Sequence, residues 1–146
     1  MRNRLVATIL LLICMVVPAY SDQNTITLQI NVSGAAPSKG HIILSLFSTV
    51  DNYLKKPIVS MTKPVSVEGS TNFEIKDLSP GKYALSAIFD EDSNGELTTG
   101  MFGIPKELVG FSNNAKGKFG PPKFDKVVFE ALTSQKITIQ LGKTRI

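Results

Sequence analysis

Apolar and polar residues alternate with a period of two along much of this chain. The pattern is strict over 25–32, where Ile26, Leu28, Ile30 and Val32 fall on one side. Such alternation predicts a β-strand with one buried face and one wet face. The same pattern predicts strands at 41–48, 65–68, 72–76, 126–131 and 136–141.

A further strand is predicted at 82–89, directly after the turn Pro80-Gly81. Its β-branched, aromatic and small residues suit a central strand. The last two strands are expected to be joined by the polar turn 133–135. No segment of helical length has a period of 3.6, although 51–56 can form one short helical turn before Pro57.

Seven short strands predict an all-β fold. The economical arrangement is an antiparallel β-sandwich of immunoglobulin-like or transthyretin-like kind, with a small barrel as the alternative. The chain has neither internal repeats nor a linker. We therefore expect one domain with one core.

The chain begins with two arginines and an apolar run over 5–17, which Pro18 ends. The run has the length of the apolar region of a secretory signal peptide and is short for a membrane span. Small residues in Ala19-Tyr20-Ser21 predict the cleavage site. The sequence thus predicts a signal peptide over 1–21, a mature domain over 22–146 and a secreted or periplasmic location.

The sequence disfavours two alternatives to a cleaved signal. Lipoprotein processing at Cys14 needs a small preceding residue, whereas Ile13 stands there. A retained membrane anchor is disfavoured by the short run and by the helix-breaking Pro18. Membrane contact is therefore expected only through the export signal.

Removal of the signal changes the composition. The only cysteine leaves with it, which excludes disulfides and thiolate metal sites from the mature domain. The full chain has 16 Lys and Arg against 12 Asp and Glu, and two of the arginines lie in the signal. The mature domain is nearly balanced in charge, so no nucleic-acid partner is expected.

The predicted strand 82–89 runs into an acidic turn, residues 90–98. Oxygen-bearing side chains stand at alternate positions around Gly95, an arrangement that hard cations such as calcium prefer. The candidate metal ligands are Asp90, Asp92, Asn94, Glu96 through its carbonyl, Thr98 and, from outside the turn, Glu107.

The match to a helix-loop-helix calcium site is incomplete. Such a loop places a glutamate at its twelfth position, which here is Met101. Either Glu107 completes the site or the ion keeps several waters. The alternative is a hairpin turn without an ion, in which Asn94-Gly95 takes positive φ and the acids face water.

Residues 100–124 form a long loop rich in glycine and in single phenylalanines. Structureless connections beyond about 12–15 residues are uncommon in compact domains and tend to be functional. In one interpretation the loop stacks aromatic rings on a sugar or peptide and meets anionic groups with lysines. Its ligand-binding residues would be Phe102, Lys106, Phe111, Asn113, Lys116, Lys118 and Phe119.

The other interpretation is a lid over the open end of the core. The phenylalanines would then be buried, Ser112 and Asn113 would satisfy loop backbone, and the lysines would be solvated. The lid is favoured, because buried aromatic side chains are commoner than exposed stacking platforms.

Three short motifs stand in this loop: Phe-Gly-Ile-Pro-Lys-Glu at 102–107, Gly-Phe-Ser-Asn-Asn-Ala at 110–115 and Phe-Gly-Pro-Pro at 119–122. Together with the acidic turn they resemble the signature of an uncharacterised family of exported bacterial proteins, domain of unknown function 2141. The resemblance extends from the first predicted strand to the last. It implies a β-sandwich outside the cytoplasm and brings no assigned activity.

Two positions depart from the pattern of that family. A histidine is usual where Phe89 stands, and an aspartate is usual where Thr98 stands. Thr98 offers a neutral oxygen, which lowers the expected affinity for an ion, and Phe89 removes a local imidazole.

The sequence presents no convincing catalytic constellation. His41, the only histidine, begins an alternating strand, where a surface imidazole is ordinary. We expect a non-enzymatic binding or structural module that contacts a glycan, a peptide or an envelope component. The alternatives are a metal-dependent or carboxylate-based hydrolase using Asp90, Asp92 and Glu107, and an assembly protein that pairs through a strand edge.

Overall fold

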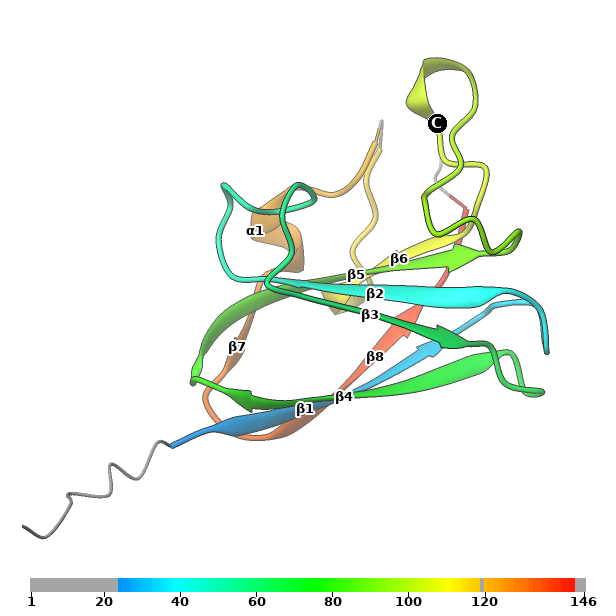
Figure 1. Cartoon of the computed structure of the whole chain (residues 1–146). Helices are drawn as coiled ribbons and strands as arrows, with labels where there is room; N and C mark the ends of the chain where they lie inside the picture. The colour runs from blue at the N-terminus through cyan, green and yellow to red at the C-terminus, as the bar shows by residue number, and fades with distance from the viewer. Residues whose placement is uncertain (1–23, 119, 144–146) are drawn as a thin grey trace, which may run out of the picture.

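The computed structural model describes residues 24–118 and 120–143, so the predicted signal peptide, with Cys14, lies outside the described residues. Strands dominate the chain (Figure 1). They are β1 (Ile26–Ser33), β2 (His41–Phe47), β3 (Val59–Pro64), β4 (Ser70–Leu78), β5 (Gly81–Asp90), β6 (Val109–Phe111), β7 (Phe129–Ala131) and β8 (Gln135–Gln140). The helical turns are η1 (Met101–Gly103), η2 (Ser112–Asn114) and α1 (Phe124–Val127).

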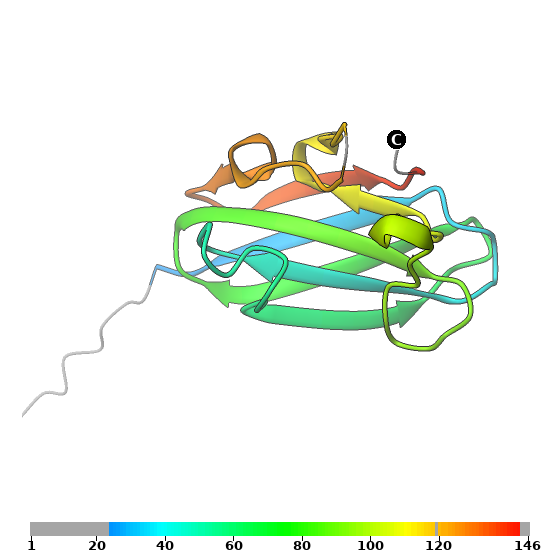
Figure 2. The ribbon, with the colours of Figure 1, turned by 90° about the horizontal axis from the view of Figure 1, so that it is seen from above.

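The strands form two sheets that lie one over the other (Figures 1 and 2). One sheet has the order β4-β1-β8, and the other has the order β3-β2-β5-β6, with β7 paired to β5. The predicted all-β sandwich is therefore confirmed. The sheets do not close into a barrel, the alternative architecture. None of the described helices is long and apolar enough to cross a membrane.

The main core fills the space between the sheets, because each strand turns alternate side chains inward. Leu28 and Ile30 of β1, Leu44 of β2, Leu85 of β5 and Ile139 of β8 are all 2 % exposed or less. Four of the strands around this core, β1, β2, β4 and β8, lie where the alternating pattern predicts them, and β5 lies where the turn Pro80-Gly81 and its composition predict it.

A second, smaller apolar cluster covers the other face of the five-stranded sheet. Phe47, Ala84, Phe111 and Val127 are its buried members. Two segments cover it: the loop 48–58, and the chain that leads into and through α1, residues 115–118 and 120–128. We call these residues together the cap. The predicted turn at 51–56 forms part of it, closed by a hydrogen bond from the Lys56 N–H to the Asn52 carbonyl (2.9 Å). Burial on both faces explains why β5 reads as a continuous apolar run.

Tyr53 joins the two segments of the cap. Its ring packs edge-on against Phe47 and Phe124, with centroids 5.5 and 5.6 Å apart. Its hydroxyl donates to the Pro122 carbonyl (3.0 Å). Burial raises the pKa of this hydroxyl to about 12 from its ordinary value of 10.0, because the phenolate would lose solvation.

We expect alkaline pH to destabilise the cap through Tyr53. The unfolded chain ionises this phenol near its ordinary pKa, whereas the folded chain keeps it neutral up to about pH 12. Its contribution is therefore complete below pH 10 and is lost between the two pKa values, by about 1 kcal/mol after allowance for solvent screening. Urea midpoints measured from neutral to alkaline pH should fall faster for the native chain than for Tyr53→Phe; parallel curves would contradict the assignment.

The strand predicted at 65–68 is wrong, and the edge strand lies just before it, as β3. Val65 is buried but Val67 is 79 % exposed in the turn that leads to β4. The alternating pattern did not predict β3, because Lys63, a polar residue, stands at one of the positions that face inward. The stem of Lys63 lies along the sheet edge, and its ammonium donates to the Asn72 carbonyl (2.9 Å) and lies 5.3 Å from the Phe73 ring centroid.

The strand predicted at 126–131 is only partly correct. α1 occupies its first residues, and the short β7 pairs with β5. The predicted turn does join the last two strands, but β7 and β8 do not pair with each other, since β8 crosses to the other sheet and runs parallel to β1. The purely antiparallel expectation is thereby corrected. β1 and β8 are far apart in the sequence, so no tight turn between them dictates an antiparallel direction.

Candidate functional site

The acidic turn follows β5 directly, and Asp90 at the end of that strand holds it together. The Asp90 side chain is only 2 % exposed. Its Oδ1 accepts the Asn94 N–H (3.0 Å) and its Oδ2 accepts the Gly95 N–H (2.9 Å). A carboxylate can be buried here because backbone donors replace the water that it loses.

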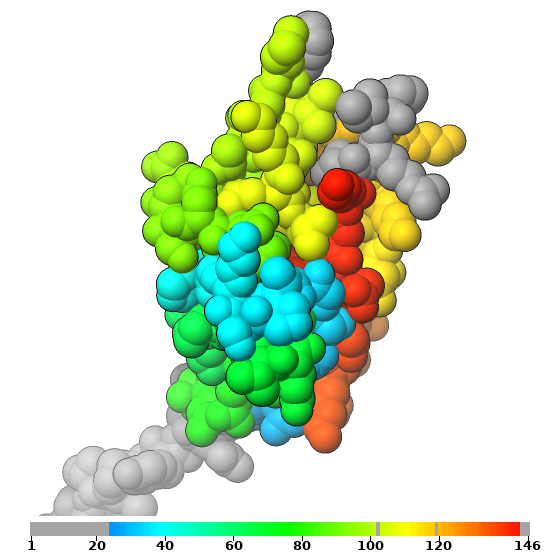
Figure 3. Space-filling model, turned by 90° about the vertical axis from the view of Figure 1, so that its right-hand side faces the viewer, coloured from blue at the N-terminus to red at the C-terminus, as the bar shows by residue number. Residues whose placement is uncertain are grey.

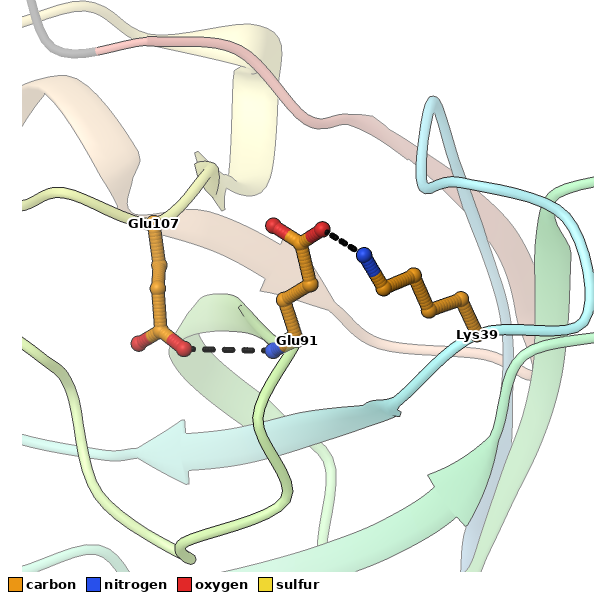
Figure 4. Close-up of polar contacts among 3 residues, drawn as sticks. All are labelled: Lys39, Glu91 and Glu107. Atoms are coloured by element: carbon orange, nitrogen blue, oxygen red, sulfur yellow. Dashed lines mark hydrogen bonds and ion pairs between the residues drawn. The ribbon is translucent and has the colours of Figure 1, made fainter.

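Glu107 closes the turn from outside. It is 8 % exposed, its Oε1 accepts the Glu91 N–H (3.1 Å), and its Oε2 accepts the Thr98 N–H (2.9 Å). Figure 4 shows the first of these bonds beside the ion pair of Glu91 with Lys39 (2.5 Å). One carboxylate therefore ties both ends of the segment 91–98.

A small hairpin brings Glu107 to this place. Thr99 bridges to Pro105, Gly100 donates to the Ile104 carbonyl (2.7 Å), and Lys106 donates to the Thr98 carbonyl (2.9 Å). The hairpin carries η1 at its tip and projects beyond the sheets, yellow-green in Figures 1 and 3. Residues 100–106 are therefore structured, and the sequence pattern did not reveal it.

Three carboxylates meet at this turn. Asp90, Asp92 and Glu107 each offer an oxygen, and these oxygens lie within 4.8 Å of one another. Calcium binds oxygens at about 2.3–2.6 Å, so two of its ligands are at most about 5 Å apart. The group matches the charge and spacing that a calcium ion requires. The side chain of Glu96 is exposed and does not belong to this group of carboxylates, so its expected ligand atom stays the backbone carbonyl.

Asn94 and Thr98 support the turn through hydrogen bonds within it. The Asn94 Oδ1 accepts the Glu96 N–H (2.8 Å), and its Nδ2 donates to Asp92 Oδ2 (3.1 Å) and to Thr98 Oγ1 (3.0 Å). Gly95 takes a positive φ of 83°. These are the hydrogen bonds of an Asx-stabilised turn, the alternative to a metal site. They orient the carboxylates but leave some lone pairs of the carboxylate oxygens free.

A shallow hollow of about 420 Å³ opens beside the carboxylates. It brings Lys39 and Lys106 near the acidic residues, so Lys106 belongs to this site rather than to an aromatic surface. His41 also reaches the turn, with its Nδ1 2.9 Å from Ser93 Oγ. The residues that line the hollow are Lys39, Glu91, Asp92, Thr98, Lys106 and Glu107.

The other candidate ligand-binding residues lie away from the hollow. Phe111 is buried in the second cluster, as a lid requires, and its ring cannot stack on a ligand. Asn113 donates to the carbonyls of Lys126 (3.2 Å) and Val128 (3.0 Å). Lys116 and Lys118 are exposed in the cap. Phe119 and the side chain of Phe102 lie outside the described part of the chain.

Ser112 has a larger structural role than its sequence suggested. It is fully buried, accepts the Leu85 N–H (2.9 Å) and donates to the Val127 carbonyl (2.6 Å). One hydroxyl thus ties β5 to the end of α1. Asn113 and Asn114, which follow, have positive φ values of 59° and 48°, a conformation that asparagine tolerates. The motif Ser-Asn-Asn therefore shapes the chain.

Comparison with known proteins identifies the family to which this chain belongs. A family model described as an uncharacterised protein conserved in bacteria, domain of unknown function 2141, matches residues 30–140. Neither a curated protein nor a solved structure matches the chain. The match spans both sheets, the acidic turn and Ser112. Because it covers most of the sequence, the chain belongs to the family of domain of unknown function 2141.

Proposed function

We propose that this protein is a non-enzymatic exported binding module whose acidic turn is ordered by a calcium ion. The observation that carries the proposal is the meeting of Asp90, Asp92 and Glu107, two of them buried, with oxygens within 4.8 Å. Three negative charges so close repel one another, and a divalent cation relieves that repulsion. The ordered turn and its hollow would then contact a glycan, peptide or other envelope component.

The tolerance of calcium for irregular geometry favours it over magnesium. Magnesium holds its ligands at about 2.0–2.1 Å in strict octahedral geometry, which limits opposite ligands to about 4.2 Å. Calcium accepts six to eight oxygens in flexible geometry, and waters can fill the positions that the protein leaves open. The exposed position of Asp92 supports such a partly hydrated ion.

The hydrogen bonds favour a binding role over catalysis. Both oxygens of Asp90 and both oxygens of Glu107 accept backbone N–H groups. Charge-assisted bonds of this kind hold a carboxylate in one orientation. A general acid or base must instead point an oxygen at the substrate, so a hydrolase using these residues is the weaker candidate.

Calcium should raise the melting temperature of residues 22–146, which contain every strand of both sheets. At a calcium concentration ten times the dissociation constant, the gain is about 1.4 kcal/mol, or roughly 3–6 °C for a domain of this size. Asp92→Asn should abolish this shift and leave the metal-free melting temperature unchanged or higher, because it removes a like charge. Differential scanning calorimetry in calcium and in chelator measures both quantities.

Glu96→Gln is the matched control, since it removes an exposed charge of the same turn that lies outside the three-carboxylate group. It should keep the calcium shift. A native domain that shows no shift at millimolar calcium, or a shift that Asp92→Asn preserves, would overturn the proposal. A larger shift with magnesium than with calcium would contradict the choice of ion.

A further inference from the structure

The outer surface of the cap exposes aliphatic side chains. Val50 is 63 % exposed, Leu54 41 % and Ile58 47 %, and all three lie in the loop 48–58. They make up half of the large apolar residues that the described chain exposes. Singly exposed apolar residues are ordinary, but a concentration in one loop marks an interaction surface.

The same surface is basic. The cap carries six exposed lysines, against the two acids Asp51 and Asp125. Among the described residues, only Lys126 of these six forms an ion pair, with Asp125 at 3.5 Å. The remainder of the described chain has seven lysines and nine acids, so positive charge is concentrated on the cap. The six are Lys55, Lys56, Lys116, Lys118, Lys123 and Lys126.

The two halves of this surface are held together. The loop 48–58, turquoise, and α1, orange, lie side by side at one end of the molecule in Figures 1 and 2. Tyr53 links them through its ring contact with Phe124 and its hydrogen bond to Pro122. The aliphatic side chains and the lysines therefore belong to one preformed surface.

Leu54 is held in an unfavourable backbone conformation at this surface. Its φ is 55°, in the left-handed region that costs a branched residue about 1–2 kcal/mol and that glycine adopts freely. The strain keeps a large apolar side chain exposed beside Lys55 and Lys56. Stability alone would favour glycine here, and strain of this kind concentrates at functional positions.

We propose that the cap docks onto an anionic phospholipid surface. Aliphatic side chains would enter the boundary between headgroups and acyl chains, and the surrounding lysines would meet the lipid phosphates. The long lysine stems suit this depth, because they cover apolar surface while the ammonium stays in water. This contact would be additional to the export signal, the only membrane contact that the sequence predicts. It does not depend on the calcium site.

Sedimentation of residues 22–146 with lipid vesicles tests the proposal. Vesicles of equal parts phosphatidylglycerol and phosphatidylcholine should bind the domain at low salt, and pure phosphatidylcholine vesicles should bind it far less. Lys55→Gln with Lys56→Gln should weaken partition about thirtyfold, since each lysine near the membrane contributes about 1 kcal/mol. Lys136→Gln, on the outer face of the three-stranded sheet, is the control and should leave partition unchanged.

Leu54→Gly separates docking from folding. It removes an exposed aliphatic side chain and relieves the left-handed strain, so the melting temperature should not fall. Partition into the anionic vesicles should nevertheless drop about tenfold. Val67→Ser, which removes a similarly exposed aliphatic group from the turn between β3 and β4, should leave partition unchanged.

Three outcomes would overturn the proposal. The first is an absence of partition into anionic vesicles at low salt. The second is equal partition into neutral and anionic vesicles, which would remove the role of the lysines. The third is a loss with the lysine variants but none with Leu54→Gly, which would show attraction by charge alone, without insertion of apolar side chains.

Discussion

Replacement of Gly40 by alanine is expected to destabilise the domain by about 3 kcal/mol. Gly40 has a φ of 61°, which a residue with a Cβ adopts only at a cost. A Cβ at this position would lie 2.3 Å from the Asp90 carbonyl oxygen and 2.9 Å from the Glu91 Cα. Both atoms are backbone, so the end of β5 and the start of the acidic turn must move.

Gly95→Ala is the matched control for Gly40→Ala. Gly95 also has a positive φ, 83°, but no atom lies within 4 Å of the Cβ that alanine would add. Gly95→Ala should therefore lower the free energy of unfolding only by the conformational cost of a positive φ, about 1 kcal/mol. Urea unfolding followed by circular dichroism measures the two losses. Equal losses of unfolding free energy in the two variants would show that the close contact of Gly40 with the acidic turn does not affect stability.

Replacement of Ser112 by alanine should have a comparable effect, a loss of about 3 kcal/mol. The Leu85 N–H and the Val127 carbonyl would both lose their bond to the hydroxyl. Ser112 is fully buried, so water cannot replace the hydroxyl at either group. Each unsatisfied group costs about 1–3 kcal/mol.

Ser134→Ala is the control for this substitution. The Ser134 Oγ also accepts a backbone N–H, that of Thr27 at 2.9 Å, but at an exposed position. Water can take over that bond, so the loss should stay below about 1 kcal/mol. The midpoint and slope of urea unfolding distinguish the two variants. If Ser112→Ala lowers the free energy of unfolding as little as Ser134→Ala does, the structural role assigned to the motif Ser-Asn-Asn is wrong.

The candidate site was predictable where it depends on neighbours along the chain. Asp90 and Asp92 occupy alternate positions around a glycine turn, and that spacing is visible in the sequence. The approach of Glu107 depends on the hairpin between Thr98 and Lys106, whose bonds follow no periodic pattern. The contributions of Lys39 and His41 come from the start of β2 and the turn before it, and sequence spacing carries no information about them.

The sequence by itself determined the strands that bury one face in the main core, because a side chain on the wrong face of β1 or β4 would meet water. It also determined the acidic turn, which is local. Only the tertiary structure decided which strands pair, that β8 runs parallel to β1, and that Phe111 is covered by the cap. These outcomes depend on contacts between residues far apart in the chain, and such contacts leave no local pattern to read.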